Sequence, residues 1–197
     1  GMRRGDDGAR WAEKFGLQTW RLHGQGNKGG RNNPLLTIDC AESGSTLRFL
    51  VPITLVRKGG ARFTGRGRLG QRPMEPYFRI FERQGISFSQ SPGPELDLTV
   101  KGELQPGEFF LPGDVSSQFI SGLLFALPLL KGNSTIHITT PLESKAYINM
   151  TIKVMRDFGV EVFSDGGSTF KVEGRQRYQS RDYLIEGDYS QAAFFLA

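Results

Sequence analysis

The feature that most constrains this chain is an internal repeat with a long period. Gly113-Asp114-Val115-Ser116 recurs as Gly187-Asp188-Tyr189-Ser190, and 187 − 113 is 74. Gly85-Ile86, at the end of an apolar-periodic helix, recurs as Gly159-Val160, and 159 − 85 is again 74. An offset third copy precedes them, because Phe15-Gly16-Leu17 matches the later Gly85 junction at a slightly shorter spacing. We therefore expect one folding unit to be used about three times.

The hydrophobic pattern within one period predicts strand, helix, strand, helix, strand, strand. This period is longer than the repeats of solenoid proteins, so we do not expect a solenoid. The fold class we expect is therefore α+β, built of tandem βαβαββ units, with the first unit incomplete. The complete unit has strands at 109–112, 134–139, 160–163 and 168–172, and helices at 116–130 and 145–158. The unit before it has strands at 62–65, 86–89 and 96–101, and helices at 44–57 and 73–84. In the incomplete first unit we expect the end of a helix at 6–15, followed by strands at 17–23 and 35–40 that are joined by a Gly/Asn-rich hairpin loop at 24–34. After the complete unit we expect a strand at 182–186 and a helix from Ser190.

Composition narrows the ligand class. The 197 residues carry a net charge of +5, which fits either a basic soluble surface or a site for small anions. Nucleic acid is a weaker interpretation, since no basic run is interleaved with aromatic residues, and we expect no nucleic-acid partner. The single cysteine, Cys40, excludes an internal disulfide and suits a reducing compartment, so we expect a cytoplasmic protein. The longest apolar stretch, 119–130, is interrupted by Ser121 and Gly122, so we expect no membrane contact.

Three loci combine small hydroxyl residues or arginines with a predicted helix start. Backbone N–H groups at such a start attract anions, although each locus also fits an ordinary helix cap or a solvated loop. The first is 43–48, with Gly44, Ser45 and Arg48. The second is the basic loop 66–73, which contains Arg72. The third joins Ser116, Ser117 and Gln118 to Ser144 and Tyr147, which begin the next helix. Because these starts recur in successive units, we favour one shared anion site.

Other chemistry is less well supported. His23 and His137 have no cysteine or carboxylate at ligand spacing, so we expect no metal site and no cofactor. We expect Cys40 to be a packing residue. Asp114 and Asp188 follow glycines and suit turns better than acid catalysis.

Five ordered strings resemble a known family: SGSTLRFL, RLGQRPM, GDVSSQFISGLL, ESKAYINMT and EGDYSQAAFFLA. They are similar to 5-enolpyruvylshikimate-3-phosphate synthase, and the resemblance covers about residues 4–197. It implies transfer of an enolpyruvyl group from phosphoenolpyruvate to the 5-hydroxyl of shikimate 3-phosphate, in aromatic amino acid synthesis. It also implies that residues 3–187 form a domain of βαβαββ units, and that residues 188–197 begin a helix of a second domain that is missing.

The resemblance assigns substrates to residues. Gly44 and Arg72 match positions that bind phosphoenolpyruvate, and Ser45 and Arg48 lie in the same glycine motif. Positions matching shikimate 3-phosphate contacts are Ser116, Ser117, Gln118, Ser144 and Tyr147. No catalytic acid or base is assigned, because the family takes these groups from its carboxyl-terminal domain. We therefore expect this chain to bind substrates with negligible turnover.

The chain departs from the family pattern at two positions, and two other interpretations of its function are open. Ser45 replaces the family's usual threonine and Phe49 a common proline, which we expect to affect co-substrate affinity and the response to glyphosate. The related UDP-N-acetylglucosamine enolpyruvyl transferase usually carries a reactive cysteine in the loop before its Arg-Pro motif, and the segment 59–72 has none. A non-catalytic module that binds anions or nucleic acid is the other alternative.

Overall fold

The computed structural model describes residues 35–183. These residues belong to one compact unit. The helix expected at 6–15, the strand at 17–23, most of the strand at 182–186 and the helix from Ser190 lie outside the described residues. The 3–187 and 188–197 division therefore stays a prediction.

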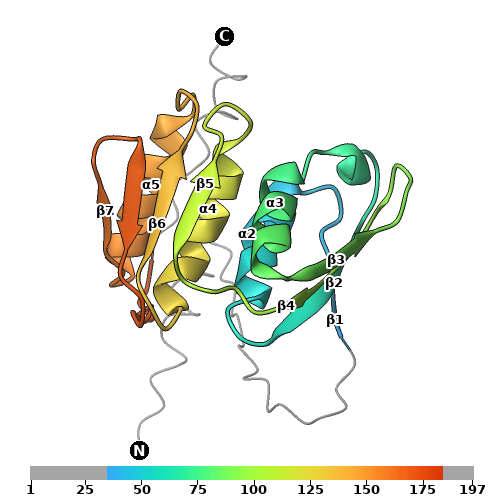
Figure 1. Cartoon of the computed structure of the whole chain (residues 1–197), viewed down its shortest axis with the longest axis horizontal. Coiled ribbons are helices and arrows are strands. Elements are labelled where there is room, and N and C mark those ends of the chain that lie inside the picture. The colour runs from blue at the N-terminus through green and yellow to red at the C-terminus, as the bar shows by residue number, and fades with distance from the viewer. Residues whose placement is uncertain (1–34, 184–197) are drawn as a thin grey trace, which may run out of the picture. The chain divides into compact units, whose positions relative to one another are not determined.

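The described residues form two successive βαβαββ modules (Figure 1). The first module comprises β1 (Leu36–Asp39), α2 (Gly44–Thr54), β2 (Gly59–Gly65), α3 (Glu75–Gln84), β3 (Ser87–Gln90) and β4 (Leu96–Gly102), with a short 3-10 turn, η1 (Leu69–Gln71). Its sheet has the order β1-β2-β4-β3. Strands β1 and β2 are parallel, whereas β4 is antiparallel to both β2 and β3.

The second module repeats this topology. It comprises β5 (Glu108–Leu111), α4 (Ser117–Ala126), η2 (Leu127–Leu129), β6 (Ser134–Ile138), α5 (Lys145–Asp157), β7 (Val162–Ser164) and β8 (Thr169–Val172). Its sheet has the order β5-β6-β8-β7, with the same parallel first pair and antiparallel remainder. Corresponding elements begin at similar offsets in sequence: 117 − 44 is 73 for α2 and α4, 145 − 75 is 70 for α3 and α5, and 134 − 59 is 75 for β2 and β6. The predicted α+β repeat is confirmed.

The glycine junctions explain why the repeat is visible in the sequence. Gly85 and Gly159 both adopt left-handed conformations, with φ of 66° and 80°. The following residue then donates its N–H five residues back, Ile86 to Phe81 O at 2.9 Å and Val160 to Met155 O at 3.0 Å. This is the helix ending that glycine favours, and it buries the apolar residue that follows. The same requirement in both modules preserves the same dipeptide pattern.

Helix lengths differ from expectation at their carboxyl ends. The helix expected at 116–130 is α helix only to Ala126, and Pro128 lies in the 3-10 turn that follows. Proline lacks the N–H that an α helix needs and clashes with the preceding turn, so α4 stops before it. The helix expected at 44–57 ends at Thr54, two residues after Pro52. Strand β2 begins earlier than expected, at Gly59.

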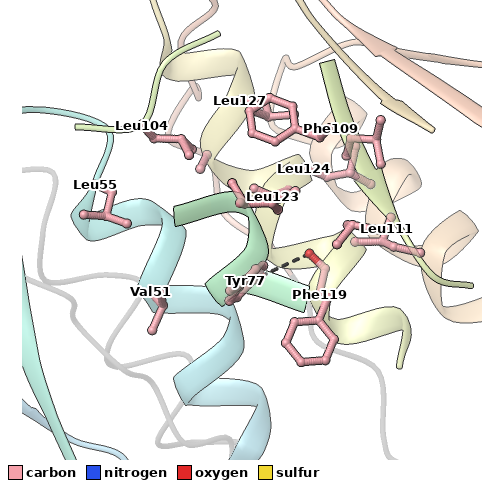
Figure 2. Packing of buried hydrophobic residues seen from close by; sticks show 14 of the residues in the cluster. Val51, Leu55, Tyr77, Leu104, Phe109, Leu111, Phe119, Leu123, Leu124 and Leu127 are labelled. Carbon is pink, nitrogen blue, oxygen red and sulfur yellow. Dashed lines mark hydrogen bonds between the residues drawn. The ribbon is translucent and has the colours of Figure 1, made fainter. Parts of the chain in front are cut away.

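A continuous hydrophobic core joins the two modules through α2, α3 and α4 (Figure 2). Tyr77 of α3 is fully buried and lies edge-on to Phe119, with ring centroids 4.9 Å apart. Its hydroxyl lies 2.7 Å from Arg48 O and 3.0 Å from Phe119 O, the latter contact drawn in Figure 2. A Cβ on Gly122 would lie 2.2 Å from Arg48 O, so glycine lets α4 approach α2 closely. The core therefore fixes how the helix starts of the two modules meet.

Candidate functional site

Helices α2 and α4 lie side by side and run in the same direction (Figure 1). Ser45 contacts Gln118 near the two helix starts, and Arg48 contacts Gly122 one turn further along. Since both contact pairs advance together along the two helices, their amino-terminal ends lie together. Residues that are far apart in sequence therefore meet at one place.

Two serines at the start of helix α2 form different hydrogen bonds. Ser43 is the N-cap, and its Oγ accepts from Thr46 N at 3.1 Å. Ser45 is left for other contacts, and its Oγ accepts from Gln118 Nε2 at 2.8 Å. The ordinary cap interpretation of this locus therefore applies to Ser43 and not to Ser45.

Arg48 is buried at the junction of the modules. It is only 6% exposed, yet it carries a guanidinium. Its Nη1 donates to Gln118 Oε1 at 2.9 Å and its Nη2 to Pro73 O at 3.0 Å. Its Cζ lies 4.5 Å from the centroid of the Phe119 ring. The buried Nε has no hydrogen-bond partner in the described part of the chain.

Arg72 lies beside the start of α2. A Cβ on Gly44 would be 2.6 Å from Arg72 Nη1, so the guanidinium occupies space that only glycine leaves at position 44. Burial lowers the pKa of the Arg48 guanidinium, and the neighbouring Arg72 cation lowers it further. Between residues 35 and 183, neither arginine forms an ion pair with a carboxylate. Two adjacent cations without a counter-charge favour an anionic ligand.

The starts of α4 and α5 are joined by their preceding loops. Gly113 N donates to Thr140 Oγ1 at 2.8 Å, and Glu143 N donates to Gly113 O at 3.3 Å. Ser116 caps α4, since its Oγ accepts from Gln118 N at 3.3 Å. Ser144 is at the N-cap position of α5 but makes no capping bond with its side chain. Its hydroxyl is therefore available to a ligand.

Ser117 and Tyr147 are related by the contact between α4 and α5. The hydroxyls of Ser121 and Thr151 lie 2.9 Å apart where these helices touch. Ser117 and Tyr147 are each four residues earlier, so each lies one turn nearer the helix start on the touching face. Tyr147 is 63% exposed, which leaves its ring open to a ligand.

The structure thus brings the predicted residues together in two linked groups. Gly44, Ser45, Arg48, Arg72 and Gln118 form the first, around the starts of α2 and α4. Ser116, Ser117, Ser144 and Tyr147 form the second, around the starts of α4 and α5. Gln118 follows Ser117 directly and so joins the two groups. The site presents hydroxyl, amide and guanidinium donors, which suits phosphate and carboxylate oxygens.

Sequence reasoning missed the supports of this site. The carbonyl of Pro73 holds Arg48, and the hydroxyl of Tyr77 bridges two helices. The apolar periodicity of α3 places Tyr77 in the core, but it gives no sign of a partner for the hydroxyl. Phe49 packs edge-on to Phe125 of α4 at 5.3 Å, which gives this departure from the family pattern a packing role.

Cys40 and Asp114 lie as expected, whereas His23 and Asp188 lie outside the described residues. Cys40 is a buried core residue, and burial, followed by the Asp39 charge, raises the pKa of its thiol to about 11. Asp114 Oδ1 accepts from Thr140 Oγ1 at 2.8 Å, as suits a turn residue. His137 contacts Glu108 and stacks on Phe110. Within 35–183, no three histidine, cysteine or carboxylate side chains gather as a metal site would require. The helices described there are too short or too polar to cross a membrane.

Comparison with known proteins identifies the family to which the chain is similar. Residues 12–197 match the family model of EPSP synthase (3-phosphoshikimate 1-carboxyvinyltransferase). The 3-phosphoshikimate 1-carboxyvinyltransferase of Clostridium botulinum (strain Eklund 17B / Type B) is 59% identical over 160 residues, which are 81% of this chain and 37% of that protein. Its counterpart in Clostridioides difficile (strain 630) is 54% identical over 166 residues, or 84% of this chain and 38% of the relative. The chain therefore spans somewhat over a third of the length of these curated relatives.

A solved structure shares the fold. The EPSP synthase of Acinetobacter baumannii superposes with a TM-score of 0.66 at 23% identity, covering 83% of this chain and 36% of that one. Enolpyruvyl-transferase-like architecture is thus shown for the two modules.

Proposed function

Because the chain belongs to the EPSP synthase family, we propose that it supplies groups that bind both substrates of an enolpyruvyl transfer site. The reaction moves the enolpyruvyl group of phosphoenolpyruvate to the 5-hydroxyl of shikimate 3-phosphate and releases phosphate. Both substrates are anionic, which fits a basic chain whose site groups are donors. The proposal rests chiefly on the adjacent Arg48 and Arg72, which have no carboxylate partner among residues 35–183.

Each group of the site suits one substrate. Ser117 and Ser144 lie at the starts of α4 and α5, where backbone N–H groups and the helix dipoles favour a phosphate. The exposed ring of Tyr147 offers an apolar face to the shikimate ring. Arg72, beside Gly44, pairs with phosphoenolpyruvate as a fork of donors.

The chemistry needs more than these donors. The 5-hydroxyl oxygen attacks C2 of phosphoenolpyruvate and loses its proton while C3 gains a proton, which gives a tetrahedral ketal. Loss of the phosphate group and of a proton from C3 then restores the double bond. Donors that hold two anions together lower the entropic part of this barrier, but none of the nine site residues is a carboxyl, imidazole or amine. We therefore propose that the chain binds both substrates in the cytoplasm and that proton transfer uses groups from the rest of the family's length.

Calorimetric titration of the full chain with shikimate 3-phosphate tests this function. We expect saturable binding with one site, weakened roughly tenfold or more by Ser117→Ala or Gln118→Ala, since each loses a hydrogen bond to an anion. Ser89→Ala is the matched control, because Ser89 is an exposed serine on β3.

Two results would contradict the proposal. One is equal affinity in all four proteins. The other is binding to oligonucleotides that weakens steeply with salt, without affinity for shikimate 3-phosphate, which would support a non-catalytic nucleic-acid module instead.

A further inference from the structure

The side chain of Gln118 connects the two modules through both of its polar atoms. Its Oε1 accepts from Arg48 Nη1 at 2.9 Å, and its Nε2 donates to Ser45 Oγ at 2.8 Å. Arg48 and Ser45 belong to α2, whereas Gln118 begins α4. A ligand that meets Gln118 therefore meets an amide already held at both ends.

The chemistry of Arg48 decides which way this amide faces. A guanidinium has five N–H donors and no acceptor, so only the carbonyl oxygen of Gln118 can face it favourably. The NH₂ group must then face Ser45. Because the Ser45 hydroxyl accepts this hydrogen bond, its own hydrogen is free to be donated elsewhere. Each group accepts from the one before it and donates to the next.

We propose that Arg48 is a positioning residue that sets the direction of a donor chain, Arg48 to Gln118 to Ser45, which ends on an anionic oxygen of a substrate. The inference rests on the proposed function for the identity of that substrate. It gives Arg48 a role through Gln118, in place of the direct substrate contact that the sequence suggests. It also explains why serine can replace the family's threonine at position 45, since the terminal hydroxyl is retained.

The contacts of Arg48 hold its side chain in one conformation. Its Nη2 is held by Pro73 O at 3.0 Å, and its guanidinium lies over the Phe119 ring. The side chain is almost fully buried, so it cannot swing toward a ligand without leaving these contacts. Its charge also polarises the Gln118 amide, which strengthens the donors further along the chain.

Matched variants separate donation from side-chain volume. Arg48→Met removes every donor, whereas Arg48→Lys keeps a positive donor on a similar stem. Ser45→Val removes the hydroxyl, whereas Ser45→Thr keeps it at the same volume as valine. For the full chain we expect Arg48→Met and Ser45→Val each to raise the Kd of shikimate 3-phosphate or of phosphoenolpyruvate roughly tenfold, by loss of a charge-assisted hydrogen bond. Lysine and threonine should restore most of the affinity.

A double-mutant cycle distinguishes positioning from a structural role. In the Arg48→Met variant the Gln118 amide is no longer oriented by the guanidinium. Adding Ser45→Val to that variant should therefore raise the Kd by less than about twofold. If Arg48 only packs the modules together, the fold increases in Kd caused by Arg48→Met and Ser45→Val multiply in the double variant. Independent effects for both ligands, or no recovery with Arg48→Lys, would overturn the proposal. Thermal unfolding of each variant identifies any loss of affinity that follows from unfolding.

The side-chain amide of Gln118 gives a readout without a ligand. Its two N–H resonances can be assigned by their absence in Gln118→Glu. We expect them to be distinct in the wild type and in Arg48→Lys, and to shift and converge in Arg48→Met. If the wild type binds neither anion, the proposed function fails, and unchanged Gln118 resonances in Arg48→Met would separately overturn this inference.

Discussion

Gly44 leaves the space that the Arg72 guanidinium occupies at the start of α2. A Cβ there would lie 2.6 Å from Arg72 Nη1, and Arg72 is an exposed side chain that can move aside. We expect Gly44→Ala to weaken phosphoenolpyruvate binding roughly tenfold by displacing this charge-assisted donor. The free energy of unfolding should change by less than about 1 kcal/mol, because alanine also favours the helix.

Gly59→Ala is the control for that substitution. A Cβ at Gly59 meets its nearest neighbour at an ordinary 3.5 Å, and its φ is not in the left-handed region. Titration of both variants with phosphoenolpyruvate, with chemical denaturation alongside, measures the two effects. Unchanged affinity in Gly44→Ala would show that Arg72 does not hold the co-substrate from this position.

Cys40 provides a test of core burial that depends on pH. The residue is 2% exposed, and burial followed by the Asp39 charge raises the pKa of its thiol from 9.0 to about 11. A raised pKa in the folded state means that the thiol's contribution to stability is intact below pH 9 and is lost between pH 9 and about 11. We expect a thiol reagent at pH 8 to react far more slowly with the native chain than with the chain in urea. Equal rates would contradict a buried Cys40.

At the residue scale, the local sequence pattern predicted where a residue lies in a helix better than it predicted which residues its side chain contacts. Ser116 and Ser144 occupy the N-cap positions of α4 and α5, as the small-polar helix starts indicate. The pairing of Arg48 with Gln118 joins residues that are far apart in sequence. Such a contact depends on how two modules pack, and no local periodicity records it.

At the scale of elements, α4 depends on a glycine for its approach to α2. A Cβ on Gly122 would lie 2.2 Å from both Arg48 O and Tyr77 Oη, atoms fixed by the core. Alanine normally stabilises a helix interior by about 1 kcal/mol over glycine. Here we expect the opposite sign, with Gly122→Ala lowering the free energy of unfolding by about 1–3 kcal/mol through overpacking.

Chemical denaturation compares Gly122→Ala with Gly59→Ala, which we expect to be nearly neutral. Stabilisation by Gly122→Ala would mean that α2 and α4 are further apart than described. Shikimate 3-phosphate affinity should fall as well, since the starts of both helices would separate.

The ends of helices lie where the sequence predicted them when a single residue determines the end. Gly85 and Gly159 end α3 and α5 at the expected places, because a left-handed residue closes each helix. Pro128 shortened α4 against the apolar pattern, which continues through Leu127 and Leu130. Hydrophobic periodicity cannot distinguish an α helix from the 3-10 turn that extends it, since both bury the same residues.

At the scale of the whole molecule, two modules with one topology place corresponding helix starts at one end of the described unit. In each module the helices follow parallel strands, so their starts meet at the carboxyl ends of those strands. Residues 40–43 and 113–116 precede corresponding helices, α2 and α4, which explains why a repeated sequence produces a clustered site. The period revealed this arrangement, whereas the close approach of α2 to α4 became visible only through Gly122 and Tyr77.

The central claim is that the starts of α2, α4 and α5 form one continuous site for anionic ligands. The most direct measurement is a two-dimensional amide spectrum of the chain titrated with shikimate 3-phosphate. We predict that amides near Ser45, Ser117 and Ser144 shift together with a single Kd, while those at the opposite helix ends, near Gly85 and Gly159, stay in place. Shifts confined to one helix start, or centred on the opposite ends, would contradict the account.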